Sequence, residues 1–427
     1  MAHRIVVVGG GAGGLELATA LGDRCREAQV TLVDRNRTHL WKPLLHEVAA
    51  GSMDIHQHQL DYLAQARWHH FRFVLGELGG LDRKSRHLLV EAVHDEQGEE
   101  VLPRRRVAYD TLVLAIGSES NDFGTPGVRE HAFTIDNAWQ AHLFHRRLVN
   151  ACFRANFAAD GRVIDIAIVG AGATGVELAA ELHNTMRVLA AYGLENFHPE
   201  RQIRLRIVEA GPRILAGLPA YIGDETLKTL HALGVEVLCG EPVVEVTAER
   251  VRTASGREVP ADFTVWAAGI RCAKVLADLD GLEANRLNQL VVDATLQASR
   301  DADIFALGDC AAAPWKDRLV PPRAQAAHQQ ANHLVKTVAR RLRDKPPLPF
   351  CYRDFGSLVS LGNYQSVGTL MGFITGGTLR LEGLLAKLFY ISLYRLHIWA
   401  LHGFWRMALD TLARSIRRQT EPKVKLH

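Results

Sequence analysis

The 427-residue sequence is poor in cysteine, and its cysteines are widely spaced. The six are Cys25, Cys152, Cys239, Cys272, Cys310 and Cys351. Because no two lie close together, the chain has no Cys-x-x-Cys redox or zinc motif, and a reductase that uses a close cysteine pair is excluded. We interpret the six as reduced, mostly buried thiols in a cytoplasmic setting.

The sequence also lacks long apolar segments and a strong excess of charge. No window of about 18 or more apolar residues is free of charges, so we expect no transmembrane helix, no ion pumping through the chain, and only peripheral membrane contact. The net charge of +3 gives no support for nucleic-acid binding. The start of the chain resembles a strand and a glycine loop rather than a signal peptide.

Histidine is plentiful, but its pattern does not predict a metal site. The pairs His56/His58 and His69/His70 have the spacing of metal ligands. Neither pair has cysteines or carboxylates arranged around it, so we predict exposed histidines and no bound metal.

The N-terminal residues have the pattern of a dinucleotide-binding βαβ unit. The apolar run Arg4–Val8 predicts a buried strand, and Gly9-x-Gly11-x-x-Gly14 follows it and opens a helix. The first glycine permits a tight turn, the second lets backbone approach a pyrophosphate, and the third allows close helix–strand packing. Asp34 ends the next strand, at the distance expected for a ribose ligand.

A second unit of the same kind begins near residue 160. The strand Val163–Val169 leads into Gly170-x-Gly172-x-x-Gly175, and Glu209 ends the partner strand. A carboxylate there would bind the adenosine ribose and repel a 2′-phosphate, which favours NADH over NADPH, although Arg206 and Arg213 weaken this preference. Two nucleotide sites on one chain suggest hydride transfer from a nicotinamide to a flavin.

The order of these units predicts a discontinuous α/β architecture. Residues 109–117 and 261–269 each place an Asp before a strand that ends in Ala-x-Gly, so the second unit looks inserted into the first. We predict an FAD-binding domain at 1–120 and 290–344, an NADH-binding domain at 121–289, and a C-terminal module at 345–427.

The C-terminal module is predicted to be a membrane-associating α+β unit. Residues Gly356–Phe373 alternate like a small antiparallel sheet, and Leu379–Arg418 have a helical period. The segment Leu384–Leu401 combines apolar residues with aromatic and basic ones, and a basic end with Arg414, Arg417, Arg418, Lys423 and Lys425 follows. This suits a helix lying in the lipid headgroup plane. The alternative is a helix buried against the sheet or a partner subunit.

Four segments are together more specific than either glycine motif: His39–Val48, Asn121–Gly127, Val265–Ile270 and Pro321–Gln329. On these segments the sequence resembles the bacterial type II NADH:quinone oxidoreductases, the single-subunit, non-pumping respiratory NADH dehydrogenases. The likeness runs through nearly the whole chain. It implies two Rossmann-like domains of the glutathione-reductase-like flavoprotein fold, and a peripheral enzyme on the cytoplasmic face of the inner membrane.

The resemblance also implies the site residues and partners. It assigns non-covalent FAD to Gly9, Gly11, Gly14, Asp34, Lys42, Ala115, Gly117 and Asp309. It assigns NADH to Gly170, Gly172, Gly175, Glu209, Ala268 and Gly269. Ala324-Gln325-x-Ala327-x-Gln329 matches the family's quinone-site pattern, so Gln325 and Gln329 are expected at a membrane quinone, ubiquinone or menaquinone. Glu177 is the expected acid near the nicotinamide. The lipid surface is the further partner, and a homodimer stays open.

Several assignments have simpler alternatives. Glu177 could only be a helix-dipole partner, an interpretation that Glu16 at the matching place in the first copy supports. Asp309 could be a helix cap, and the Ala/Gln-rich segment could be only a good helix former. A sulfide:quinone oxidoreductase would need Cys152, Cys310 and Cys351 to meet, and a non-enzymatic alternative is a flavin-based NADH sensor.

Overall fold

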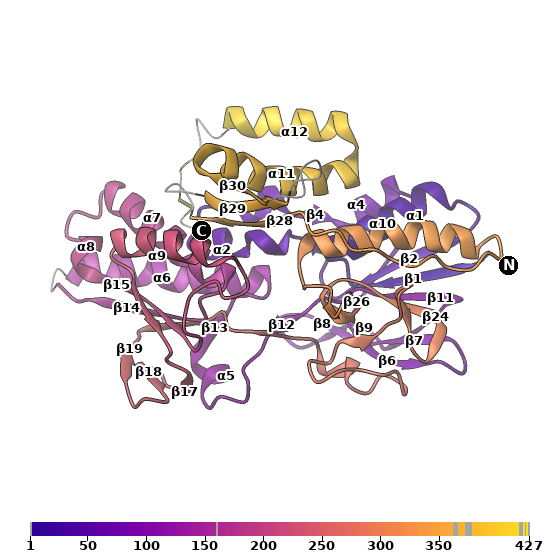
Figure 1. Ribbon diagram of the computed structural model, residues 1–427, viewed down its shortest axis with the longest axis horizontal. Coiled ribbons are helices and arrows are strands. Elements are labelled where there is room, and N and C mark those ends of the chain that lie inside the picture. Colours follow the sequence, from indigo (N-terminus) through magenta and orange to yellow (C-terminus); the bar gives the residue numbers. More distant parts are fainter. Residues whose placement is uncertain are drawn as a thin grey trace.

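The computed structural model describes residues 2–158, 161–361, 366–371, 378–417, 422, 424 and 425. Figure 1 shows two halves side by side, each built on a sheet, and a C-terminal layer with α11 (Gly383–His402) and α12 (Phe404–Arg417) above them. Among the described helices, none is long and apolar enough to cross a bilayer.

The first half is a six-stranded sheet in the order β23-β24-β11-β1-β2-β5. All neighbouring pairs are parallel except β23 and β24. Its strands are β1 (Arg4–Val8), β2 (Gln29–Asp34), β5 (Arg72–Leu75), β11 (Thr111–Leu114), β23 (Gln297–Ala298) and β24 (Asp301–Ala306), and α1 (Ala12–Arg24) and α10 (Ala324–Arg341) pack together beside it. The first sheet resumes after the inserted unit, because β24 pairs in parallel with β11. Continuous β-branched and apolar runs form such strands because both faces of a parallel sheet are covered.

The second half is a five-stranded parallel sheet in the order β13-β20-β14-β15-β16. Its strands are β13 (Ala132–Thr134), β14 (Ile164–Val169), β15 (Ile203–Glu209), β16 (Glu236–Cys239) and β20 (Phe263–Trp266), and its helices are α6 (Ala138–Ala158), α7 (Ala173–Ala191) and α9 (Ala220–Ala232). Glu209 lies further from its glycine loop than Asp34 does, partly because α7 has 19 residues where α1 has 13.

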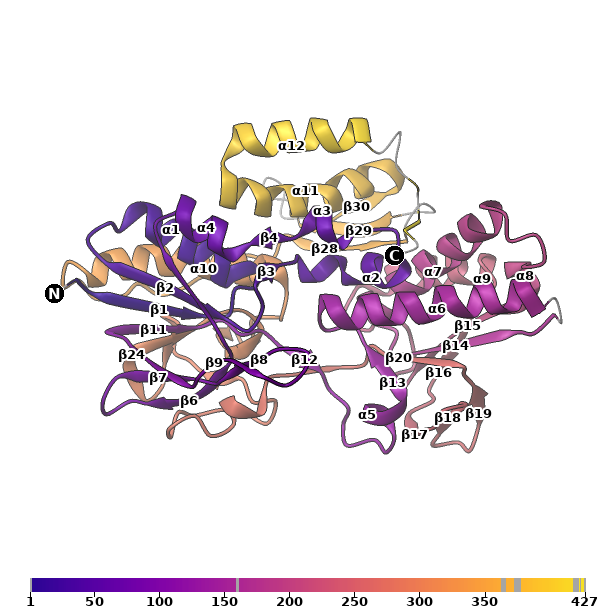
Figure 2. The same cartoon turned by 180° about the vertical axis from the view of Figure 1, so that it is seen from behind.

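Smaller elements complete both halves. They are β3 (Thr38–His39), η1 (Lys42–Leu44), α2 (Leu45–Ala50), α3 (Ile55–His58), β4 (Leu60–Asp61), α4 (Tyr62–Trp68), β6 (Leu78–Asp82), β7 (His87–Val90), β8 (Val93–His94), β9 (Glu100–Leu102), β10 (Arg105–Ala108), α5 (Val128–His131), α8 (Pro199–Gln202), β17 (Val243–Val246), β18 (Arg250–Thr253), β19 (Glu258–Pro260), η2 (Lys274–Leu276), β22 (Leu290–Val291), η3 (Gly308–Cys310), β25 (Ala311–Ala312), β26 (Pro314–Trp315) and β27 (Arg318–Leu319). The antiparallel pair β12 (Glu119–Ser120) and β21 (Ile270–Arg271) lies between the halves in both views (Figure 1, Figure 2).

The repeated Asp before an Ala-x-Gly strand has a structural explanation. Asp110 accepts hydrogen bonds from the backbone and guanidinium of Arg4, at the start of β1. Asp262 accepts one from the backbone N–H of Asp165, at the start of β14. In both halves this carboxylate holds the start of the central strand against its neighbour.

The C-terminal module differs from the prediction at the start of its helical part. The antiparallel sheet β28-β29-β30 consists of Gly356–Ser360, Ser366–Met371 and Thr378–Glu382, so residues 379–382 form a strand rather than the start of the helix. Residues 362–365 and 372–373 of the predicted sheet lie outside the described residues, as do Arg418 and Lys423 of the predicted basic end. The helix begins at Gly383 and is interrupted at Gly403, whose φ is +79°.

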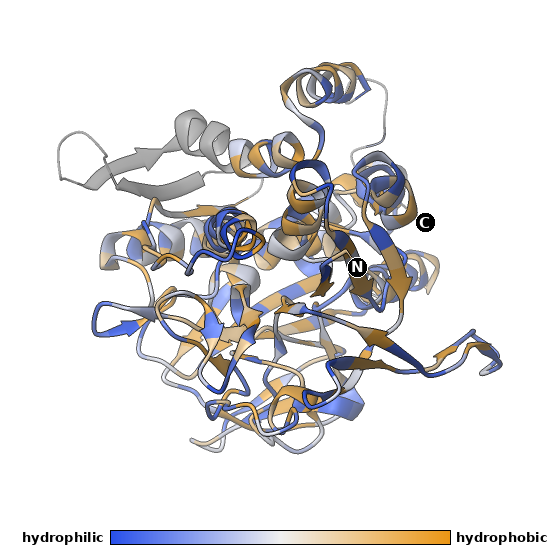
Figure 3. Cartoon of the chain, turned by 90° about the vertical axis from the view of Figure 1, so that its right-hand side faces the viewer, coloured by the Kyte–Doolittle hydropathy of each residue, from blue (hydrophilic) through white to orange (hydrophobic). Residues whose placement is uncertain are grey.

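The two C-terminal helices have different surroundings. The described part of α11 buries His397, Ile398 and Leu401, and the helix contacts α1 and the small sheet. The helix α11 is therefore partly buried, which agrees in part with the alternative to an interfacial helix. The outer helix, α12, exposes Trp405, Leu409 and others, and Figure 3 shows hydrophobic and hydrophilic residues along this uppermost helix.

The third glycine of each loop is required by close packing between loop and helix. A Cβ on Gly14 would lie 1.8 Å from the Gly9 carbonyl oxygen, and one on Gly175 would lie 2.0 Å from that of Gly170. The second glycines differ, since no atom lies within 4 Å of a Cβ on Gly11 or Gly172. The third glycine therefore serves the fold, whereas the second keeps space open in front of the loop.

We therefore expect Gly175→Ala to lower the free energy of unfolding by about 1–3 kcal/mol, because the added methyl group must displace backbone. Urea unfolding measures this change. Gly172→Ala is the matched control and should unfold at the wild-type midpoint. Equal destabilisation by both substitutions would contradict the assigned packing.

Candidate functional site

Both glycine loops open on one continuous cavity of about 2500 Å³. From the first half it is lined by Gly9, Gly11, Asp34, Lys42, Ala115, Gly117 and Asp309, and from the second half by Gly172, Thr174 and Glu177. The α10 residues Gln325 and Gln329 also line it. Residues that are far apart in sequence are thus brought to one site, where two bound dinucleotides can approach each other.

The first loop is held open by the carboxylate of Asp34. Asp34 accepts hydrogen bonds from the backbone N–H groups of Gly10, at 2.6 Å, and Asn36, at 2.7 Å. Burial raises the pKa of Asp34 against these hydrogen bonds. Gly11 faces open space at the start of α1, where free N–H groups and the helix dipole favour a phosphate. These residues fit the pyrophosphate and ribose of a dinucleotide.

A chain of polar contacts continues the first-half site toward α10. Lys42 Nζ donates to the Ser118 carbonyl oxygen at 2.6 Å, and the Ser118 hydroxyl donates to Asp309 Oδ2 at 2.7 Å. Asp309 lies inside the short helix η3, whose N-cap is Leu307, so it is not the helix cap that was the simpler alternative. Its carboxylate faces the cavity wall together with Gly117.

The second loop repeats the carboxylate arrangement. Glu209 accepts hydrogen bonds from the backbone N–H groups of Ala171 and Gly211, both at 2.7 Å. Arg206 pairs with Asp165 and Glu236, and Arg213 donates to the carbonyl oxygens of Leu215, Ala216 and Leu218. Both arginines are therefore engaged elsewhere, which removes the main objection to an NADH preference.

Some of the predicted nucleotide residues support the loops without lining the cavity. Glu209, Ala268 and Gly269 are not among the described residues at its surface. A Cβ on Gly170 would lie 2.9 Å from the Ala268 backbone, so Ala268 lies behind the second loop. Gly269 has a φ of +61° and lies against the Phe123 ring. These residues shape the backbone from which a nucleotide site is built.

Glu177 is buried beside a histidine. Its Oε1 accepts a hydrogen bond from the backbone N–H of Ser360, and its Oε2 lies 3.7 Å from His46 Nδ1. Burial raises the pKa of Glu177 to about 8 and lowers that of His46 to about 4. At neutral pH both are therefore largely uncharged, so this contact is not an ion pair. Glu177 has specific partners beyond the helix dipole.

The two glutamines of α10 use their amides to hold the adjacent segment. Gln325 donates to the Gly356 carbonyl oxygen at 2.9 Å and accepts from the Phe355 N–H. Gln329 exchanges two hydrogen bonds with the backbone of Arg353. Both residues line the cavity, and their amides fix the chain between α10 and β28.

Sequence patterns did not reveal a set of buried histidines on the first-half side. His328 and His397 each form a hydrogen bond with Glu16, and His397 also contacts His39. His39 and His328 lie in segments that the family resemblance singled out, but neither received a role. His397 could not be linked to them, because it is 358 residues from its partner His39.

The three cysteines that the sulfide:quinone alternative requires lie in different parts of the structure. All six thiols are free. Cys152 and Cys310 belong to the cores of different halves, and Cys351 is exposed. Burial raises the pKa of Cys152 to about 12 and that of Cys310 to about 11, which makes them poor nucleophiles. This geometry gives no support to the sulfide:quinone alternative.

The histidine pairs make local contacts. His58 contacts the Asp54 carbonyl oxygen, and His69 pairs with Asp23. Within the part of the chain that the structure describes, no three His, Cys, Asp or Glu side chains are grouped to hold a metal ion.

Known proteins share both the sequence and the fold. Residues 3–331 match the pyridine nucleotide-disulphide oxidoreductase family. The chain is 42% identical to the type II NADH:quinone oxidoreductase of Haemophilus influenzae, across 99% of each chain. It is 29% identical to the enzyme of that name from Staphylococcus aureus, over 86% of this chain and 90% of the other.

Solved structures show the same fold at low identity. NDH2 from Plasmodium falciparum in complex with NADH is 18% identical, with a TM-score of 0.82 and full coverage of both chains. The sulfide:quinone oxidoreductase of Aquifex aeolicus is 17% identical, with a TM-score of 0.74 over 94% of this chain and 91% of the other. Likeness at this level shows the architecture alone.

Fold and site together define a flavoprotein oxidoreductase with two dinucleotide sites. The chain belongs to the pyridine nucleotide-disulphide oxidoreductase family and, within it, to the type II NADH:quinone oxidoreductases. The predicted fold class and family are confirmed, and FAD and NADH are the cofactors of this class.

The buried state of Glu177 predicts a pH-dependent stability. The folded carboxyl has a pKa of about 8 against an ordinary value of 4.5, so the folded chain retains a proton that the unfolded chain loses. The stability of the wild type relative to Glu177→Gln should therefore fall as pH rises from 4.5 to about 8, and level off above that. Urea unfolding of both proteins across this range measures the difference. A constant difference would mean that Glu177 is ionised throughout.

Proposed function

We propose that the chain oxidises NADH and passes the electrons through FAD to a membrane quinone, without pumping protons. The observation that carries this function is the single cavity onto which both glycine loops open. FAD, when bound, supplies the redox chemistry: it accepts a hydride and returns two electrons. The chain's own contribution is to bind, orient and shield the reactants, and holding them in near-attack geometry can lower a barrier by about 7 kcal/mol.

We assign the two nucleotides to the two halves. FAD would occupy the first-half site, at residues Gly9, Gly11, Gly14, Asp34, Lys42, Ala115, Gly117 and Asp309. NADH would occupy the second-half site, at Gly170, Gly172, Gly175, Glu209, Ala268 and Gly269. The corresponding domains are 1–120 with 290–344, and 121–289. Packing supports this division except in two places. Leu45 and Val48 of α2 belong to the core of the second half, whereas Leu276 and Leu279 belong to the core of the first half.

We assign Glu177 to the nicotinamide side of the cavity. It follows the second loop at the start of α7 and is buried next to His46, and both line the cavity. A largely protonated carboxyl there can donate a hydrogen bond or a proton, and the buried carboxylate left behind would favour taking up another proton. It would orient NADH or transfer a proton during turnover.

We assign Gln325 and Gln329 to the quinone side as residues that form its wall. Their amides bind backbone at residues 353–356, so their contribution would be to fix the segment that borders the quinone rather than to react. The adjoining part of the cavity is apolar and aromatic, with Leu40, Trp41 and Tyr394, which suits a quinone ring and tail.

We propose that α12 attaches the protein to the cytoplasmic face of the inner membrane. Its exposed apolar side chains are Phe404, Trp405, Leu409, Leu412 and Ile416. Arg406 and Arg417 lie on the same helix and suit an anionic headgroup layer. An exposed apolar row of this length is rarely left to water.

Stopped-flow spectroscopy tests the function. NADH should bleach the flavin absorption without air, and a soluble quinone should restore it, with NADPH much slower in the first phase. Many NADH molecules should be oxidised per protein, which would exclude a sensor as the main role. Sulfide in place of NADH should leave the flavin oxidised. A protein without flavin, or one whose flavin NADH does not bleach, would refute the proposal.

The nucleotide preference depends on Glu209. Glu209→Gln removes the negative charge that Glu209 places at the second loop while keeping a similar shape, so discrimination between NADH and NADPH should fall by about tenfold, the effect of losing one charge-assisted hydrogen bond. The ratio of kcat/KM for the two nucleotides measures this. Glu236→Gln, one strand away, is the control and should keep the wild-type ratio.

Membrane attachment can be tested separately from turnover. Trp405→Ala combined with Leu409→Ser should weaken sedimentation with phosphatidylglycerol-containing vesicles, while NADH oxidation by a soluble quinone stays at the wild-type rate. Trp139→Ala is the control, because Trp139 is 69% exposed on the second half. If both variants sediment like the wild type, α12 is not the attachment site.

A further inference from the structure

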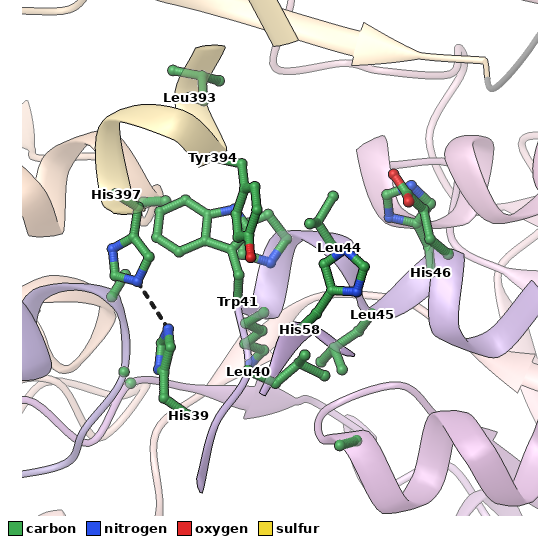
Figure 4. Close-up of a pocket in the computed structure, with 18 of the residues that line it drawn as sticks. His39, Leu40, Trp41, Leu44, Leu45, His46, His58, Leu393, Tyr394 and His397 are labelled. Atoms are coloured by element: carbon green, nitrogen blue, oxygen red, sulfur yellow. Dashed lines mark hydrogen bonds between the residues drawn. The ribbon is translucent and has the colours of Figure 1, made fainter. Parts of the chain in front are cut away.

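Four buried or half-buried side chains from four elements form an unbroken chain of hydrogen bonds beside the cavity. His328 Nδ1 lies 2.5 Å from Glu16 Oε2, and Glu16 Oε1 lies 2.6 Å from His397 Nδ1. His397 Nε2 lies 3.0 Å from His39 Nε2, the contact drawn in Figure 4. All four residues line the cavity.

The partners at both ends determine which ring nitrogens carry protons. The Gly10 carbonyl can only accept, so His39 Nδ1, at 2.8 Å from it, must donate. At the other end, Asn332 Nδ2 donates to His328 Nε2, at 3.0 Å, so His328 Nδ1 carries the proton directed at Glu16. His39 is thus satisfied as a neutral ring, and His328 donates to Glu16 through Nδ1, a hydrogen bond that raises the pKa of His328.

His397 cannot be satisfied as a neutral ring beside an ionised Glu16. Its Nδ1 must donate to the carboxylate, and its Nε2 must donate to the unprotonated Nε2 of His39. Either His397 carries both ring protons, or Glu16 is protonated and donates to His397. In both arrangements the Glu16–His397 pair holds one proton more than a carboxylate and a neutral imidazole.

The surroundings favour storage of this proton on the pair. Burial lowers the pKa of His39 to about 3, so His39 does not take it. Although burial raises the pKa of Glu16, hydrogen bonds from His328 and His397 hold it below its ordinary value. The other groups that face the array are Trp41, the Tyr62 hydroxyl and His402 further along α11. The Trp41 ring is tilted against His397 with the centroids 4.2 Å apart, and the Tyr62 hydroxyl donates to the Gly10 carbonyl oxygen.

The overall reaction needs such a proton. A quinone takes up two electrons and two protons to become a quinol, whereas NADH delivers a hydride, which is two electrons and one proton. One further proton must therefore come from water in every turnover. His328 has a partly exposed side chain and connects the buried pair to solvent.

We propose that Glu16 and His397 form the proton store for quinone reduction, reloaded from solvent through His328. His39 is a positioning residue, since it fixes the His397 ring through Gly10. When a proton leaves the pair for the quinone, His328 passes its Nδ1 proton to Glu16 and takes another from water on Nε2. Rotation of the His328 ring then directs an N–H at Glu16 again, which restores the starting arrangement for the next turnover. The inference rests on the proposed function but concerns only the reduction of the quinone, not the oxidation of NADH.

The first test observes the stored proton directly. In wild-type holoenzyme with ¹⁵N-labelled histidine, one resonance should report a ring protonated on both nitrogens at neutral pH, and it should be absent from His397→Gln. If Glu16 holds the proton instead, the His397 resonance should report a neutral ring with a strongly shifted Nε2–H signal. This resonance should also be absent from His397→Gln. The proposal would be overturned if one ring nitrogen of His397 carried no proton and also accepted no hydrogen bond.

The second test separates the two half-reactions. In Glu16→Gln and His328→Gln, bleaching of the flavin by NADH should keep its wild-type rate. Reoxidation by quinone should slow by about 100-fold or more, the usual effect of losing a proton-transfer group. It should also gain a larger solvent isotope effect. His333→Gln is the control, because His333 is on α10 like His328 but contacts the Leu348 carbonyl oxygen rather than the array, and it should behave like the wild type.

The outcomes distinguish the proposal from the function on which it rests. Loss of bleaching in wild-type protein would refute the proposed function itself. Wild-type reoxidation and isotope effects in Glu16→Gln and His328→Gln would refute the proton store while leaving the function intact. If Glu16→Gln does not fold, His328→Gln and the resonance of the unaltered protein still decide the question.

Discussion

The geometry of the site depends on a carboxylate that binds the backbone of each glycine loop. Asp34 accepts from Gly10 N–H, and Glu209 accepts from Ala171 N–H, each from the end of the neighbouring strand. This contact fixes the turn, so that the second glycine faces open space and the helix N-terminus faces the cavity. Both nucleotide sites therefore follow from one hydrogen bond repeated in two halves.

Much of this architecture could be predicted because its signals are local. In the first copy the whole motif fits within about 35 residues, from the strand through the glycine loop and the helix to the acidic end of the next strand. It can be recognised without knowing how distant parts of the chain pack. The small C-terminal sheet was harder: residues 379–382 fit a helical period equally well, and their pairing with β29 decided for a strand. The placement of α2 in the second core was likewise a tertiary effect.

The contacts of Glu16 and Glu177 could not be predicted from the sequence. Glu16 and Glu177 occupy equivalent places, and their likeness suggested a shared role at a helix start. In the structure Glu16 lies between two histidines, whereas Glu177 lies by one histidine that burial keeps neutral. The difference comes from His328, His397 and His46, which reach these acids from other parts of the fold, and no spacing in the sequence encodes those encounters.

The last described residues return to the molecule's interior contacts. Lys425 N–H donates to the Gly51 carbonyl oxygen, and the Lys425 carbonyl oxygen contacts His145 Nε2, so this short segment joins α2 to α6 next to the cavity. The distance between α2 and α6 therefore depends on a chain segment more than 200 residues further along the sequence, so a change at Lys425 would alter the wall of the reaction chamber.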